Sequence, residues 1–132
     1  NEKVVFSFHT ALFLLGLSDR APVFFHISVP QGYNVGHIKK RTENIKAHYV
    51  KKENFDLGII SVRTSFGNEV RCYDMERTIC DIVSERNIID KQIFVDAITG
   101  YFKNRAKNTR NLIKYSRILG VEGEIRKYME VL

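Results

Sequence analysis

The sequence predicts an α+β domain: a small antiparallel or mixed sheet of about four strands, packed with an N-terminal helix and a helical C-terminal half. Two patterns predict it. Residues 23–73 contain short runs in which apolar and polar residues alternate, whereas apolar residues before and after this region recur at helical spacing. The 132 residues contain no internal repeat and no Gly/Ser linker, so we expect one domain over residues 1–132.

The first expected element is a helix in the segment FHTALFLLG. Ser7 precedes this segment and is placed to cap it, and Gly16 is placed to end it. Phe8, Leu12 and Leu15 fall on one face, as an amphipathic helix requires. A polar turn, SDRAP, follows and separates the helix from the first strand.

Four strands are expected in the middle of the chain. The segment VFFHISVP alternates and stops at Pro30, the loop QGYNVG follows, and IKAHYVK alternates again. The segment GIISVRTSFGNEVRCY has the pattern of two strands joined around Gly67-Asn68, a hairpin signal. Together these four runs account for the whole expected sheet.

The period changes to helical after Tyr73. Met75, Ile79 and Ile82 are spaced for one helical face. Further helical patterns extend over about 90–103, 109–119 and 121–132, with Asp90 and Thr109 as expected caps and Gly120 as an expected stop.

Composition excludes several classes of protein. Hydrophobic residues make up 44% of the chain, which excludes a disordered protein. No apolar run approaches the roughly 20 residues that span a bilayer, and no secretory signal is present, so we expect a cytoplasmic protein without membrane contact. Cys72 and Cys80 lack metal-binding spacing and are expected to be reduced core thiols.

No motif for a cofactor or a catalytic nucleophile is present. The four histidines, at 9, 26, 37 and 48, are scattered over different expected elements, so a zinc site would require a fold that gathers them. The chain has no P-loop, no dinucleotide-binding glycine pattern and no G-x-S-x-G. We therefore expect no cofactor and no enzymatic activity.

The string DMERTICD combines acids, a base and a cysteine at an expected strand-to-helix junction. Asp74 is placed to cap the helix, Glu76 to complement the helix dipole, and Arg77 to pair with Asp81 four residues on. Alternatively, Asp74, Glu76 and Asp81 converge on a divalent metal, as in a nuclease. Helical spacing points positions 74 and 76 apart, which favours the architectural interpretation over the metal site.

The strongest charge signal lies between residues 101 and 119. This segment contains six Lys or Arg and no acid, within a chain of net charge +6. If one helix persisted through it, five of these residues would form a single stripe suited to a phosphate backbone. If the helix broke near Asn108, Arg110, Lys114 and Arg117 would still share a face. The expected nucleic-acid-binding residues are Lys103, Arg105, Lys107, Arg110, Lys114 and Arg117, with a second cluster at Lys39, Lys40 and Arg41. A solvated face that keeps the protein soluble is the alternative.

Three segments resemble one protein family. In order and spacing, SFHTALFLLGLSDRAP, VPQGYN and YDMERTICDIV are similar to the C-terminal domain of the AbiEi family, the antitoxins and transcriptional regulators of bacterial abortive-infection systems. The similarity runs from about Phe6 to Val83. The first motif departs from the family pattern Ser-His-Glu-Thr-Ala, because Phe8 and His9 follow Ser7 here. Leu15 also replaces a histidine common in the family, and both changes favour a structural role for the first helix.

The resemblance implies a function. Family members carry an N-terminal winged helix-turn-helix that binds operator DNA; this chain lacks it and begins at Asn1, as expected for part of a longer protein. The resemblance implies a non-enzymatic domain that counteracts a nucleotidyltransferase-like toxin and supports autorepression, with basic surfaces contacting operator DNA or RNA. Direct contact with the toxin is not required by the resemblance. A protein–protein module that binds an acidic toxin surface and a metal-dependent nuclease remain the alternatives.

Overall fold

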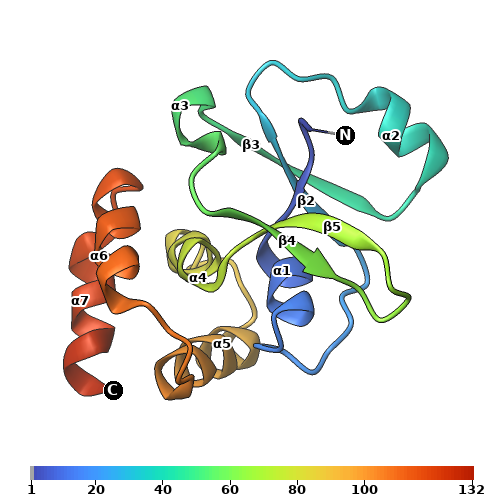
Figure 1. The fold of residues 1–132 in the computed structure, drawn as a ribbon. Helices are drawn as coiled ribbons and strands as arrows, with labels where there is room; N and C mark the ends of the chain where they lie inside the picture. Colours follow the sequence, from blue (N-terminus) through green and yellow to red (C-terminus); the bar gives the residue numbers. More distant parts are fainter. Residues whose placement is uncertain (1) are drawn as a thin grey trace.

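A computed structural model describes residues 2–132 and contains one five-stranded sheet with seven helices (Figure 1). The α+β class is confirmed. The elements in chain order are β1 (Val5–Phe6), α1 (Phe8–Leu14), β2 (Phe25–Pro30), α2 (Gly36–Arg41), β3 (Ile45–Val50), α3 (Lys52–Phe55), β4 (Ile59–Arg63), β5 (Glu69–Tyr73), α4 (Met75–Ser84), α5 (Lys91–Lys103), α6 (Thr109–Ile118) and α7 (Glu122–Val131).

The sheet is mixed, with the strand order β3-β2-β1-β5-β4. β1 pairs antiparallel with β2 and parallel with β5, and the remaining pairs are β2–β3, which is parallel, and β4–β5, which is antiparallel. The expectation of about four strands missed β1, the strand at the centre. Two residues are too few to show an alternating pattern, so β1 carries no periodic signal.

The two faces of the sheet are covered differently. On one face, α1 packs on β2 and against α4, which in turn contacts α5, α6 and α7. On the other face, Val35 and Ile38 of the α2 region pack on Ile27 and Val29 of β2. Figure 1 shows α6 and α7 at one side of the molecule and α2 at the opposite side of the sheet. The helical C-terminal half therefore forms the main core with α1 and α4.

Two short helices, α2 and α3, were not expected. QGYNVG was expected to be a loop, but α2 begins at its last residue, Gly36, and ends at Arg41. Neither α2 nor α3 has a side-chain cap hydrogen bond, and each is too short for a helical period to be visible. Both are held by tertiary packing, through Ile38 and Phe55 respectively.

Most helix boundaries agree with the sequence signals, and two caps differ. Asp90 caps α5 by accepting from Ile93 N, and Gly16 and Gly120 follow helix ends with positive φ of 76° and 77°. Thr109 is not the cap of α6, because the Asn108 side chain accepts from Asn111 N. Ser7 occupies the cap position of α1, but it makes no side-chain cap bond, since its Oγ accepts from Ser28 Oγ.

None of the helices within residues 2–132 combines the length and apolar character that crossing a bilayer requires. The longest, α5, has 13 residues.

Candidate functional site

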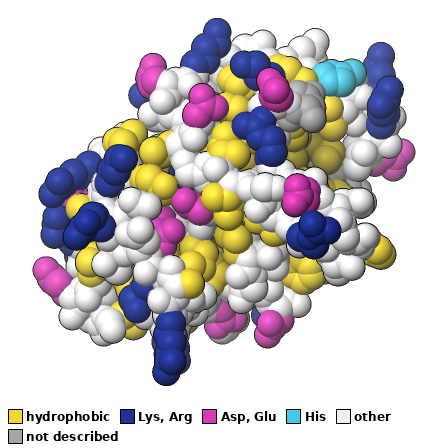
Figure 2. All heavy atoms as spheres, in the orientation of Figure 1, with side chains coloured by type: hydrophobic (Ala, Val, Ile, Leu, Met, Phe, Trp, Pro, Cys, Tyr) yellow, Lys and Arg dark blue, Asp and Glu magenta, His cyan; other side chains and the backbone are white. Residues whose placement is uncertain are grey.

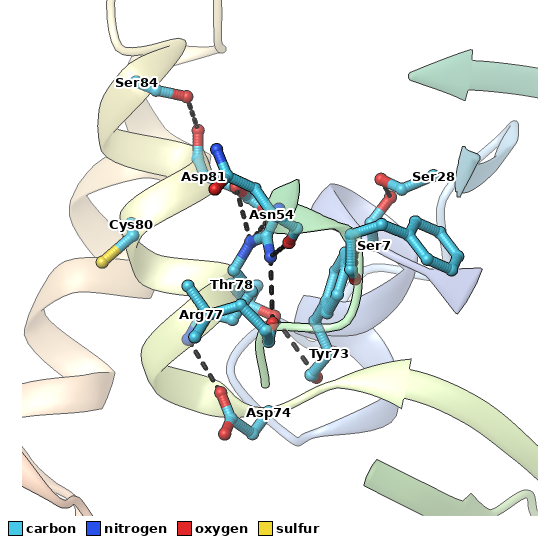
Figure 3. Close-up of polar contacts among 12 residues, drawn as sticks. Ser7, Ser28, Asn54, Tyr73, Asp74, Arg77, Thr78, Cys80, Asp81 and Ser84 are labelled. Carbon is cyan, nitrogen blue, oxygen red and sulfur yellow. Dashed lines mark hydrogen bonds and ion pairs between the residues drawn. The ribbon is translucent and has the colours of Figure 1, made fainter. Parts of the chain in front are cut away.

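The string DMERTICD begins α4, where Asp74 caps the helix as expected. Its carboxylate accepts from Arg77 N at 2.8 Å (Figure 3). It also accepts from the Tyr115 hydroxyl at 3.0 Å, so one side chain joins the start of α4 to α6. Gly58 precedes β4 with φ +85°, and a Cβ there would lie 2.8 Å from Arg77 Cβ and 3.1 Å from Asp74 Oδ1. This corner therefore requires glycine, both for its backbone conformation and for its space.

Arg77 is among the most deeply buried side chains of the molecule, with 1% relative exposure. Its Nε lies 3.1 Å from Asp81 Oδ1, which confirms the expected pair, and its Nη1 donates to the carbonyls of Asn54 and Leu57 at 2.7 and 2.9 Å (Figure 3). Its guanidinium also lies 4.1 Å from the Tyr73 ring centre. Arg77 thus ties α4 to α3, to the loop before β4 and to β5.

Asp74, Glu76 and Asp81 do not converge. The Glu76 carboxylate accepts from the Tyr101 hydroxyl and from Asn108 N, both at 2.8 Å, and so connects α4 to α5 and to the start of α6. Asp81 is committed to Arg77. Burial raises the pKa of Asp81, and Arg77 opposes that shift. Each acid holds a different contact, an arrangement that suits tertiary anchoring better than joint coordination of a metal.

The two cysteines lie in the core. Cys72 and Cys80 are both free and buried, and burial is the main cause that raises the pKa of each thiol to about 12. A thiol with this pKa stays protonated at neutral pH, whereas nucleophilic cysteine chemistry requires the thiolate. The two thiols are therefore inert core groups, as the sequence predicted.

The basic segment does not form one stripe. Helix α5 ends at Lys103 and α6 begins at Thr109, so Arg105 and Lys107 lie in the connection. Of the two alternatives, the structure has the one in which the helix breaks near Asn108, because Asn104 ends one helix and Asn108 caps the next.

A basic face remains on α6 alone. Arg110, Lys114 and Arg117 are exposed at a helical spacing of four and three, and Figure 2 shows Lys and Arg side chains gathered at the edge formed by α6 and α7. Arg117 forms an ion pair with Glu122 at 3.0 Å. The half-buried Lys107 donates to the carbonyl of Asn104. Within residues 2–132, no carboxylate lies within ion-pair distance of Lys103, Arg105, Arg110 and Lys114.

The second expected cluster lies elsewhere. Lys39, Lys40 and Arg41 are exposed in the last turn of α2, where cations complement the helix dipole. Helix α2 and helix α6 lie on opposite sides of the sheet (Figure 1). The structure therefore does not combine the two basic groups into one surface.

The fold gathers three histidines that the sequence left scattered. His9 of α1 stacks on His26 of β2 with ring centres 4.4 Å apart, and His26 Nδ1 lies 3.0 Å from Nε2 of His48 in β3. The ring of Phe8, which holds a left-handed backbone at φ 48°, stacks on His48 at 4.0 Å. His37 lies apart and faces Tyr33. Strand alternation alone placed His26 and His48 on the less apolar side of their strands, but only the pairing of β2 with β3 brings them together.

These histidines are held in their neutral form. Burial is the main cause that lowers the pKa of His26 to about 3 and that of His48 to about 4, and it also lowers the pKa of His9. A distance of 3.0 Å fits a hydrogen bond between a protonated and an unprotonated nitrogen, so the two rings are not both in the cationic form. Residues 2–132 contain no group of three His, Cys, Asp or Glu side chains arranged to hold a metal ion.

No protein-family model matches this chain, and a search of curated proteins finds no match either.

Proposed function

We propose that this chain is the C-terminal, non-enzymatic domain of an AbiEi-like antitoxin and transcriptional regulator. In this proposal the domain acts in the cytoplasm, contacts operator DNA or RNA and counteracts a nucleotidyltransferase-like toxin. The exposed basic face of α6 carries the proposal: Arg110 and Lys114 have no carboxylate within ion-pair distance among the described residues, and Arg117 stands one turn further along the helix. Unneutralised cations on one face suit phosphate contacts that do not depend on base sequence.

The motif at α4 supports the non-enzymatic part of the proposal. Its acids accept hydrogen bonds from the Arg77 side chain, from two tyrosine hydroxyls and from backbone amides. Its cysteine is a protonated core thiol. An acid that already anchors a helix contact is poorly suited to accept a proton from a substrate, because that use would break the contact.

A salt titration of nucleic-acid binding tests the proposal. Filter binding of this chain to duplex DNA and to tRNA is expected to be strongest at low salt, with log K falling linearly as log salt rises. The double variant Arg110→Glu/Lys114→Glu is expected to weaken binding to every sequence and to reduce the salt slope by about two, or about one for each lost phosphate contact.

The matched variant is Lys39→Glu/Lys40→Glu, which makes the same change of charge on α2. We expect it to retain most of the binding, because α2 lies across the sheet from α6. Equal loss in both variants would mean that net charge, and not the α6 face, governs binding. Absence of binding to either nucleic acid at low salt would contradict the proposed nucleic-acid contact.

A further inference from the structure

Half of one sheet face is apolar and, among residues 2–132, only partly covered: most of its apolar side chains are half-buried, and Cys72 between them is fully buried. The registers Ile60↔Cys72 and Phe6↔Cys72 place Ile60 and Phe6 on the same side of the sheet, and Val62↔Val70 adds a second row. Val4 packs with Phe6 on this side. Ile60 is 39% exposed. We call these five residues, Val4, Phe6, Ile60, Val62 and Val70, the open sheet face.

The open sheet face borders a hollow of about 490 Å³ beside α2. Val4, Phe6 and Val70 form its floor and Ile38 of α2 one wall. Figure 2 shows hydrophobic side chains between α2 and the β4–β5 hairpin, with Lys, Arg and His side chains and also Asp or Glu side chains around them. Helix α2 packs on β2 and β3 through Val35 and Ile38. Among the described residues, the half formed by β1, β5 and β4 is apolar and has no helix packed on it in the same way.

Two arginines line the rim of the hollow, Arg41 of α2 and Arg71 of β5, and Lys40 lies in the same turn as Arg41. The acid in the lining, Glu69, forms an ion pair with Arg63 at 3.5 Å. An apolar floor with a cationic rim complements a peptide segment that has one apolar face flanked by acidic residues.

Two other occupants fit less well. Four of the five residues of the open sheet face are aliphatic, whereas single-stranded nucleic acid is held by stacking of its bases on aromatic rings. A second copy of this chain would bring an identical cationic rim against the first, and the chain already carries a net charge of +6. A protein partner with acidic residues avoids both difficulties.

We propose that the open sheet face binds an amphipathic helix of a partner protein, with the apolar side of that helix on Phe6, Ile60 and Val62 and its acidic residues against Arg41. The partner helix would lie beside α2 and complete the layer that α2 begins. This site is separate from the basic face of α6, so either proposal can fail without the other.

The test uses a fluorescein-labelled 18-residue peptide with Leu at helical spacing on one side and Glu on its flanks. Fluorescence anisotropy is expected to show saturable binding to the whole chain. Ile60→Lys, on an edge strand where lysine is tolerated, and Arg41→Glu are each expected to weaken binding by about tenfold or more. Lys91→Glu on α5 makes the same charge change as Arg41→Glu at a distant exposed position and is expected to leave binding unchanged.

Several results would overturn this proposal. One is absence of peptide binding at about 1 mM, where even a weak specific site is occupied. A second result is equal binding of a control peptide that has Lys in place of Glu, which would show that the charge of the peptide does not determine binding. If an oligothymidine of 15 nucleotides bound more tightly than the peptide, and Ile60→Lys abolished that binding, the face would be assigned to nucleic acid. If sedimentation showed a dimer of the chain that Ile60→Lys dissociates, the face would be assigned to a second copy. Thermal unfolding of each variant verifies that it remains folded.

Discussion

At the scale of the residue, Arg77 connects more segments than any other side chain of the α4 motif. It bonds to Asp81 within α4 and to two carbonyls before β4, and its guanidinium lies over Tyr73 of β5. The sequence predicted the Arg77–Asp81 pair from its spacing. An exposed pair at this spacing stabilises a helix by only a few tenths of a kcal/mol. Because both groups are buried, removal of one partner leaves an uncompensated charge, which is a much larger effect.

Arg77→Met is therefore expected to lower the free energy of unfolding by about 3–5 kcal/mol, since it leaves the Asp81 carboxylate and the carbonyls of Asn54 and Leu57 without their donor. Urea denaturation measures the change. Arg86→Met, which removes an exposed arginine with a 3.9 Å contact to Glu124, is the matched control and is expected to cost less than about 1 kcal/mol. Similar losses in the two variants would contradict the anchoring role of Arg77.

The buried histidines predict a dependence of stability on pH. The pKa values of His26 and His48 in the folded state, about 3 and about 4, lie below the ordinary 6.5, so the unfolded chain binds more protons as the pH falls. Stability is then complete above pH 6.5 and is lost progressively as the pH falls, by about 1.4 kcal/mol per pH unit for each histidine, down to about pH 4 for His48 and about pH 3 for His26. The raised pKa of Asp81 acts in the opposite direction, because its folded form binds the extra proton.

Urea denaturation at pH 7 and at pH 5 tests this prediction. His48→Asn is expected to lose less stability than the unmodified chain between these two pH values, whereas His37→Asn, outside the cluster, is expected to lose as much. Asp81 is present in all three proteins, so its opposing contribution cancels in the comparison. If His48→Asn retained the full pH dependence, the cluster would not be its source.

At the scale of the element, the long helices were predictable and the short elements were not. α4, α5 and α7 have enough residues for their apolar period to show, and Asp74, Asp90 and Gly120 mark their boundaries. α2, α3 and β1 have six, four and two residues. They form because one or two of their side chains pack against neighbouring elements, which a local pattern does not record.

The cap of α6 is Asn108, one residue before Thr109, which the sequence favoured. Asn108→Ala is expected to cost about 1 kcal/mol of stability, because the amide of Asn111 loses its side-chain acceptor. Thr109→Ala, at the position that the sequence favoured, is expected to be neutral or slightly stabilising, since Ala is the better helix former. Chemical denaturation of the two variants separates the assignments, and a larger loss in Thr109→Ala would favour the sequence-based cap.

At the scale of the whole molecule, the sheet depends on its shortest strand. β1 joins the β2–β3 pair to the β4–β5 pair, and Val5 within it is fully buried. The N-terminal residues of β1 therefore hold the β2–β3 pair and the β4–β5 pair together in one sheet.

Removal of residues 1–6 is expected to abolish the cooperative thermal transition, because it separates the two halves of the sheet and exposes the apolar surface between them. Circular dichroism during heating measures the transition. Removal of residues 130–132, which are exposed at the end of α7, is the control and is expected to leave the transition in place. A cooperative transition after the N-terminal deletion would show that the two halves hold together without β1.

The sequence by itself determined the α+β class, the helical half, the caps at Asp74 and Asp90 and the pairing of Arg77 with Asp81. Each depends on residues close together in the chain, whose spacing fixes their geometry. Only the tertiary structure decided the central place of β1, the meeting of His9, His26 and His48, the separation of the α2 and α6 cations and the partly covered half of the sheet. Each of these depends on which strands pair and which faces pack, and contacts between residues far apart in the chain leave no periodic trace in the sequence.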